Sequence, residues 1–377
     1  MSKSLFAVGA LCLAATAAHA QSSVTLYGLI DAGITYTNNQ HGQKNFQATS
    51  GDINGSRFGL RGAEDLGGGL KAIFTLENGF NIQNGQLGQG GRLFGRQAFV
   101  GLSSDSYGTV TVGRQYDSVV DYIGPLSLTG TQYGGTHFAH PYDNDNLDNS
   151  FRVSNSVKYQ SINYGGFRLG GLYGFSNQAG GFASNRAYSV GASYNWGPLN
   201  VAAGYLQLNN AGTTFASGAV SDDATFIAGT QRTFGGGVNY AFGPAVAGLV
   251  ITQTNLSNAT GIGAYASGTS KGFALADGSA RFTNYEVNGR YNFTPALAFI
   301  GAYTFTDARL AGVSPKYNQV SLRTDYALSK RTDVYLEGEY QHVSGTGNSG
   351  ITADITGLSA SSTNSQVAAT IGLRTRF

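Results

Sequence analysis

The sequence predicts an all-β protein, an antiparallel transmembrane β-barrel. Three observations predict it: strict two-residue alternation, no apolar run long enough for a spanning helix after the N-terminal leader, and connections that alternate in length. From residue 284 to residue 293, apolar or aromatic residues occupy one parity, and polar or charged residues occupy the other. Successive side chains of a strand point to opposite faces. The apolar face is therefore either the core of a soluble sandwich or the lipid-facing surface of a barrel.

The N-terminal segment has the features of a secretory signal peptide. Lys3 precedes an apolar run over residues 5–18, and a small-residue motif ends at Ala20. The run is too short for a membrane anchor, so we expect cleavage after Ala20. The remaining residues, 21–377, then form a single barrel domain. Cys12 is the only cysteine and lies within the leader, which excludes a disulfide scaffold.

Composition excludes several function classes. Charged residues make up 12% of the chain, with 23 Lys and Arg against 21 Asp and Glu. A nucleic-acid binder would show a clustered basic excess, so no nucleic-acid partner is expected. Neither a metal site nor a cofactor is expected. After the leader no segment approaches the ~20 apolar residues of a spanning helix, so a spanning domain must be a closed barrel.

Alternating segments continue along almost the whole chain, and we count roughly sixteen of them. Residues 24–36, 56–62 and 70–80 are the first three, and residues 333–341 and 367–377 are the last two. Sixteen strands allow about 22 residues for each strand and its connection, enough for spanning strands of about 9–11 residues. An even number is expected for a single-chain bacterial barrel. Fourteen or eighteen strands stay open as alternatives.

Connection lengths favour the barrel over the sandwich. Short turns lie at 196–198, 242–244, 293–295 and 329–331. The long polar connections are expected at residues 38–52, 116–151, 208–231, 252–280 and 343–365. Outer-membrane barrels have short turns at the periplasmic end and long loops at the extracellular end. Aromatic residues beside the short turns would form one interfacial girdle.

Five sequence blocks resemble the general outer-membrane porins of β-proteobacteria. They are SVTLYG at 23–28, SRFGLRGAEDLG at 56–67, FGRQAFVGL at 94–102, YGTVTVGRQ at 107–115 and GLRTRF at 372–377. The resemblance implies a 16-stranded, homotrimeric diffusion channel of the outer membrane. It also implies that the third long loop folds inward to narrow the pore.

Selectivity of such a channel depends on the electrostatics of its narrowest region. The alternation predicts a basic wall on the lumen side of the barrel, made of Arg57, Arg61, Arg96, Arg152 and Lys158, and we add Arg114 to it. Arg114 belongs to this set although it shares the parity of Val110 and Val112. The resemblance assigns Arg57, Arg96 and Arg152 to the basic cluster of the constriction.

The opposing acidic wall is expected from the third loop. Its acids are Asp117, Asp121, Asp143, Asp145 and Asp148, and Asp121 is the first choice. Asp117 in the loop and Glu77 on a strand are the other candidates for the acidic side. The terminal aromatic, Phe377, shares the parity of Leu373 and is expected at the lipid interface. The resemblance also makes Phe377 part of the signal that the barrel-assembly machinery recognises.

The sequence therefore predicts a non-enzymatic channel for small hydrophilic solutes and ions, with a weak preference for anions. Expected partners are two further copies of the chain, outer-membrane lipid and lipopolysaccharide, and the assembly machinery. A barrel enzyme, a soluble adhesion or binding protein, and a substrate-specific channel are the alternatives. His41, His137, His140 and His342 lack a catalytic or metal-binding context. We interpret His137 and His140 as solvated loop residues.

Overall fold

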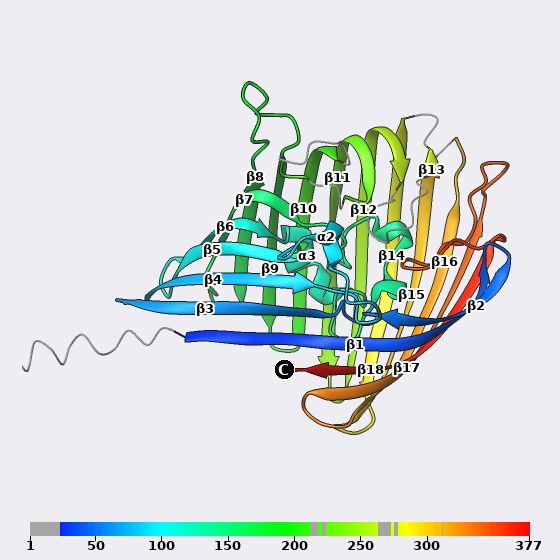
Figure 1. Cartoon of the computed structure of the whole chain (residues 1–377), viewed down its shortest axis with the longest axis horizontal. Coiled ribbons are helices and arrows are strands. Elements are labelled where there is room, and N and C mark those ends of the chain that lie inside the picture. Colours follow the sequence, from blue (N-terminus) through cyan, green and yellow to red (C-terminus); the bar gives the residue numbers. More distant parts are fainter. Residues whose placement is uncertain (1–22, 212–217, 221–223, 263–272, 275–277, 311) are drawn as a thin grey trace, which may run out of the picture.

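A single antiparallel sheet accounts for most of the molecule (Figure 1). The computed structural model describes residues 23–211, 218–220, 224–262, 273–274, 278–310 and 312–377. The expected signal peptide, residues 1–20, lies outside the described residues. The strands are β1 (Ser23–Gln40), β2 (Gln43–Ser50), β3 (Arg57–Gly67), β4 (Leu70–Gly79), β5 (Gln97–Ser104), β6 (Gly108–Gln115), β7 (Val153–Gln160), β8 (Phe167–Gly174), β9 (Ala187–Trp196), β10 (Leu199–Ala211), β11 (Phe226–Phe242), β12 (Ala245–Ile262), β13 (Phe273–Ala274), β14 (Ser279–Asn292), β15 (Leu297–Leu310), β16 (Lys316–Ala327), β17 (Thr332–Ser344) and β18 (Ser365–Arg376).

Sixteen of these strands close into a barrel, which confirms the predicted fold. The first strand, β1, pairs with β3 on one side and with the last strand, β18, on the other. The ring then runs from β3 through β12, passes directly from β12 to β14, and continues to β18. The two strands outside this count, β2 and β13, lie beside β1 and β12 respectively. Closure matters because it leaves no strand edge unpaired in lipid.

The prediction of a long loop at residues 38–52 is wrong. The structure instead continues β1 to Gln40 and returns as β2, with a turn at His41 and Gly42. Both turn residues have positive φ, 50° and 92°. Two-residue hairpins of this kind match the twist of the strands they join. The segment therefore forms a hairpin although its polar composition resembles a loop.

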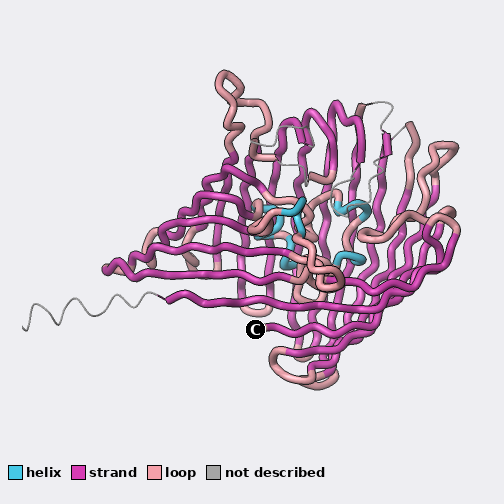
Figure 2. The backbone as a smooth tube through the Cα atoms, viewed as in Figure 1, coloured by secondary structure: helices cyan, strands magenta, loops and turns pink. Residues whose placement is uncertain are grey.

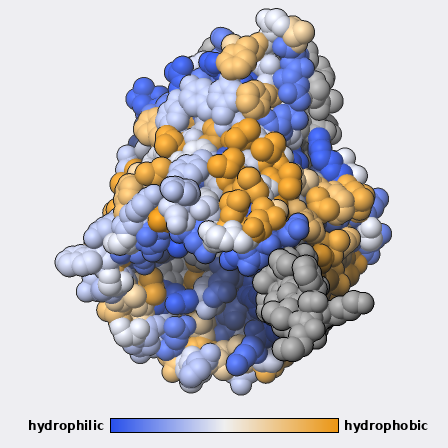
Figure 3. Space-filling view, turned by 90° about the vertical axis from the view of Figure 1, so that its left-hand side faces the viewer, coloured by the Kyte–Doolittle hydropathy of each residue, from blue (hydrophilic) through white to orange (hydrophobic). Residues whose placement is uncertain are grey.

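The outer face of the barrel is apolar, as the alternation predicts. Val100, Val190, Val287 and Ile371 are all more than half exposed, at 57–62% of their surface. In Figure 3 apolar residues gather on part of the outer wall, and hydrophilic residues surround the hollow. The aromatic residues beside the short turns are exposed too; Trp196 reaches 70%. Among the described residues, no helix is long and apolar enough to cross a membrane.

Short helical segments lie inside the barrel (Figure 2). Most belong to the third loop, residues 116–152, which connects β6 to β7. The helices are α2 (Gly88–Gly91) between β4 and β5, and, within the third loop, α3 (Ser118–Tyr122), η2 (Gly124–Leu126), η3 (Thr136–Phe138) and η4 (Pro141–Asp143). The α3 segment packs on β9 and β10, where Val119 and Ile123 are fully buried with Leu206. The third loop thus folds inward and narrows the lumen.

Candidate pore constriction

Two segments fold into the lumen and face each other. One is the third loop, and the other is the inward segment, residues 51–56, which separates β2 from β3. Both flanking strands pair with β1: β2 with its C-terminal half and β3 with its N-terminal half. The inward segment is therefore an excursion from a single barrel wall. Thr136 in the third loop donates its backbone N–H to the carbonyl oxygen of Asp52, 3.1 Å away, and so joins the two segments.

A buried carboxylate holds the inward segment. The Asp31 carboxylate on β1 accepts hydrogen bonds from the backbone N–H groups of Ile53 and Asn54, both at 2.9 Å. It also accepts one from the Tyr335 hydroxyl at 2.7 Å. Arg374 on β18 donates to Oδ1 of Asn54 at 2.5 Å. These contacts fix Ile53 and Asn54 against the pore, because each backbone donor has a charged acceptor.

A buried histidine, His140, joins the third loop to the barrel wall at β14. The His140 imidazole lies 2.7 Å from Asp145 through Nδ1 and 2.9 Å from Glu286 on β14 through Nε2. All three side chains are at most 1% exposed. Burial favours the neutral imidazole, but the Asp145 and Glu286 carboxylates outweigh it and raise the pKa of His140 to about 10. We call His140, Asp145 and Glu286 the loop latch.

Two arginines from the C-terminal strands hold the middle of the third loop. Arg323 on β16 donates to the carbonyl oxygen of Gly134 at 2.9 Å and pairs with the Glu337 carboxylate. Arg374 donates to the carbonyl oxygen of Gln132 at 2.8 Å and pairs with Asp333 at 2.9 Å. Each guanidinium therefore satisfies loop carbonyls while a strand carboxylate balances its charge. The loop is fixed to the wall along much of its length.

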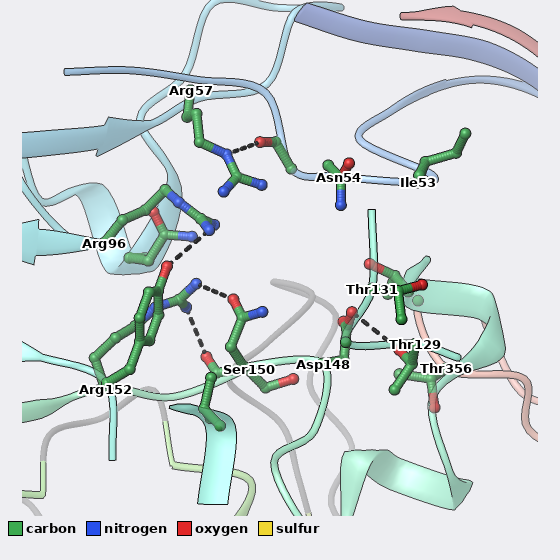
Figure 4. A pocket seen from close by; sticks show the side chains of 18 of the residues that line it. Ile53, Asn54, Arg57, Arg96, Thr129, Thr131, Asp148, Ser150, Arg152 and Thr356 are labelled. Carbon is green, nitrogen blue, oxygen red and sulfur yellow. Dashed lines mark hydrogen bonds between the residues drawn. The ribbon is translucent and has the colours of Figure 1, made fainter. Parts of the chain in front are cut away.

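The lumen between these segments holds a cavity of about 600 Å³. Arg57, Arg96 and Arg152 line one side of it (Figure 4). Tyr116 aligns two of these guanidinium groups: its hydroxyl accepts from Arg96 at 2.9 Å, and its ring lies 5.3 Å from the Arg152 guanidinium carbon. Arg57 donates to the carbonyl oxygen of Gly55 at 2.8 Å. Guanidinium groups keep their charge over the working pH range, so this wall is permanently basic.

The same cavity is lined on other sides by two carboxyl groups, Asp148 from the third loop and Asp354 from the loop before β18. In Figure 4 Asp148 lies across the cavity from the three arginines. Burial, and then the neighbouring Asp143 carboxylate, raise the pKa of Asp148 to about 7. Burial raises the pKa of Asp354 to about 7 as well. Both groups therefore change charge near neutral pH, whereas the arginines do not.

Comparison with known proteins decides the family. The profile of Gram-negative porins matches residues 7–346. The chain belongs to the Gram-negative porin family. An outer membrane porin of Bordetella pertussis is 37% identical over 90% of this chain and 94% of its own length. The major outer membrane protein P.IB of Neisseria lactamica is 30% identical, covering 95% and 99% of the two chains. Among solved structures, an anion-selective porin from Comamonas acidovorans covers 95% of this chain and 100% of its own, at 25% identity and a TM-score of 0.74.

The porin family confirms the predicted resemblance, the outer-membrane location and the function as a passive channel for small solutes. The long loops of this porin therefore face the cell exterior, and its short turns face the periplasm. The cavity therefore lies in the lumen of a channel protein, with Arg57, Arg96 and Arg152 among its lining residues.

The remaining residues of the predicted basic wall do not line this cavity of the porin. Arg61 lies on β3 with its guanidinium carbon 5.2 Å from the Tyr27 ring. Lys158 on β7 pairs with Asp121 and donates to the carbonyl oxygen of Tyr116 at 3.0 Å. Arg114 is only 8% exposed and donates to the carbonyl oxygen of Gly95 at 2.8 Å.

Arg114 is buried although it shares the sequence parity of two exposed residues. Val110 and Val112 on the same strand are 45% and 52% exposed. The pairing of β6 with β7 shifts register between Gly113 and Gln115. Such an irregularity re-aims the side chain at the bulge. A backbone irregularity, which alternation alone does not reveal, thus explains the burial of Arg114.

The three residues predicted for the acidic side of the porin make structural contacts. Asp117 begins α3 as its N-cap and accepts from the backbone N–H of Val119 at 2.7 Å; burial raises its pKa to about 6. Asp121 pairs with Lys158 beside a separate cavity. Glu77 accepts from Nε of Arg96 at 2.8 Å and from the Tyr27 hydroxyl at 3.0 Å. Their predicted roles at the constriction stay predictions.

The interpretation of His137 and His140 as solvated residues is wrong. His137 is 4% exposed and lies 3.3 Å from Glu337, and His140 forms the loop latch. Both are buried because the third loop folds into the barrel. Phe377 is 47% exposed, and its backbone pairs with Gly28 of β1. Its ring packs over Gly28, where an added Cβ would lie 2.6 Å from the Phe377 Cζ atom.

Proposed function

We propose that this porin is a passive channel with a weak preference for small anions, and that Arg57, Arg96 and Arg152 form its selectivity wall. The observation that carries the proposal is the alignment of three guanidinium groups on one side of the cavity (Figure 4). The two facing carboxyl groups, Asp148 and Asp354, are neutral or only partly ionised below neutral pH. Fixed positive charge therefore exceeds negative charge in the constriction. The similarity to the Comamonas acidovorans protein, an anion-selective porin, supports the same direction.

Reversal potentials across a planar bilayer in a salt gradient test this proposal. Arg57→Gln is the best single change, because this side chain donates to a backbone carbonyl oxygen and its loss leaves Glu77 paired with Arg96. A charge about 7 Å from a passing ion contributes about 0.6 kcal/mol in a water-like dielectric. The same charge attracts an anion and repels a cation, so we expect the anion-to-cation permeability ratio to fall about sevenfold.

The matched control is Arg331→Gln in the turn between β16 and β17, which removes the same charge from the periplasmic rim. This control should leave the permeability ratio unchanged. An unchanged ratio after Arg57→Gln, or a cation preference in the unaltered protein, would contradict the proposal.

The proposal extends to the partners of the channel. The working assembly is a homotrimer, which the generally trimeric state of related porins supports. Outer-membrane lipid and lipopolysaccharide surround it, and the assembly machinery recognises the C-terminal Phe377. Residues 1–20 direct export and are removed. The protein performs no catalytic step, and channel openings in groups of three in a bilayer would support the trimer.

A further inference from the structure

A row of polar side chains crosses four neighbouring strands near the extracellular end of the barrel. Arg232 on β11 pairs with Asn255 on β12. Asn255 pairs in turn with Arg281 on β14, and Arg281 pairs with Arg309 on β15. We call these four residues the outer arginine row. Because each pair is in direct register, their side chains stand on the same face of the sheet.

That face is the outside of the barrel. Arg232 is two residues from Phe234, and Arg281 is four residues from Tyr285, so each shares the parity of an outward aromatic residue. Phe234 and Tyr285 are 41% and 43% exposed. Arg232 and Arg309 are exposed as well. The outer arginine row therefore borders the lipid-facing band on the side of the long loops.

The charges of the row are poorly balanced within the chain. Arg281 and Arg309 lie directly opposite each other, an arrangement of like charges that destabilises a sheet. Asp307 is 3.5 Å from Arg281, but Lys316 is the direct neighbour of Asp307 on β16. In the described structure the Nε atom of Arg281 is buried and has no hydrogen-bond partner. An anion between the two arginines would offset their repulsion.

The row also has a space for such an anion. A cavity of about 490 Å³ is lined by Asn255, Arg281 and Arg309 together with Ser279 and Ser314. Guanidinium groups match the geometry of phosphate through paired N–H donors. The amide of Asn255 can add a further hydrogen bond. The donor set is therefore suited to a phosphate group.

We propose that the outer arginine row binds a phosphate group of the outer-leaflet glycolipid. The row faces the membrane rather than the lumen, and it lies beside the apolar band that contacts acyl chains. A lipid bound there can place its chains against Phe234 and Tyr285 while its phosphate meets Arg281 and Arg309. The inference rests on the proposed contact with lipopolysaccharide, to which it adds a specific site.

Binding of defined lipids to the full-length protein in detergent tests the site. Native mass spectrometry can compare bis-phosphorylated lipid A with dephosphorylated lipid A, and inorganic phosphate can serve as a soluble competitor. The test variant is Arg281→Gln with Arg309→Gln. The control is Lys330→Gln with Arg331→Gln, which removes two exposed charges from the periplasmic turn. We expect at least tenfold weaker binding of phosphorylated lipid to the test variant and unchanged binding to the control.

Three results would overturn the proposal. They are equal binding of dephosphorylated lipid A, equal loss in the control, and displacement of the lipid by inorganic phosphate at equimolar concentration. If the double variant does not fold, Arg309→Gln alone removes an exposed charge and should still weaken binding severalfold. Conductance and ion selectivity of the variant should stay unchanged. A failure of this site therefore differs from a failure of the channel proposal.

Discussion

Replacing His140 by alanine should detach the third loop around this residue from the barrel wall at β14. The imidazole lies between Asp145 and Glu286, at 2.7 Å and 2.9 Å, with no exposed surface of its own. Its removal leaves two buried carboxylates without the cation between them. Removing one partner of a buried ion pair costs about 3–5 kcal/mol.

The pKa of His140 indicates how the stabilising effect of this interaction depends on pH. A rise from 6.5 to about 10 corresponds to about 5 kcal/mol in favour of the charged imidazole. Because the folded pKa is higher than the unfolded pKa, this contribution is complete below pH 6.5 and decreases as the pH rises toward 10. We therefore expect His140→Ala to lower the free energy of unfolding by about 3–5 kcal/mol at neutral pH.

Thermal unfolding of the detergent-solubilised protein measures the loss, and single-channel current noise reports motion of the loop. His41→Asn at the exposed hairpin turn is the control, because asparagine tolerates the positive φ of this position. A second change, Glu286→Gln, should restore part of the stability of His140→Ala, because one unpaired carboxylate is then removed. The latch would be refuted if His140→Ala had the same melting temperature and the same noise as the unaltered channel.

Three further predictions concern pH, pore width and assembly. In the unaltered channel the preference for anions should rise as the pH falls from 8 to 6, because the pKa values of Asp148 and Asp354 are both about 7 and the protonated groups are neutral. The double variant Asp148→Asn with Asp354→Asn should remove this pH dependence of the reversal potential. Asp31→Asn should raise conductance and lower stability by about 1–3 kcal/mol, since backbone donors of the inward segment lose a charged acceptor; a conductance equal to that of the unaltered channel would count against this. Gly28→Ala should lower the refolding yield measured by heat-modifiable electrophoresis, because the new Cβ would lie 2.5 Å from the Arg57 carbonyl oxygen and 2.6 Å from the Phe377 ring. Full yield would show that both the β3 backbone and the ring shift to make room.

The regular part of the barrel could be predicted because its period is fixed by the backbone. The alternation at 284–293 places Glu286 on the polar face and Tyr285 on the apolar face, and the structure buries the first and exposes the second. The short turns at 196–198 and 242–244 join the strands as predicted. Side chains of a strand alternate between two faces. Once the apolar face is known, the face on which every other side chain lies is therefore fixed.

The constriction could be predicted only in part, because its acidic side depends on how a loop folds in three dimensions. Asp148 was one of five loop acids, and nothing local distinguishes it from Asp121. A local signal did exist for Asp117: an aspartate directly before a short helix is a preferred N-cap, which competes with a role in the pore. The inward segment has no periodicity, so its return to the lumen depends on the distant residues Asp31 and Arg374.

The third loop and the inward segment are held by residues from late strands: Glu286 on β14, Arg323 on β16 and Arg374 on β18. A growing barrel that lacks these strands keeps the contacts of Asp31 on β1 and of α3 with β9 and β10, but it lacks these later anchors of the constriction. Selective passage is therefore acquired only when the last strand joins the first. An incompletely assembled barrel would let solutes pass without selection. Selective permeability therefore indicates that assembly of the barrel is complete.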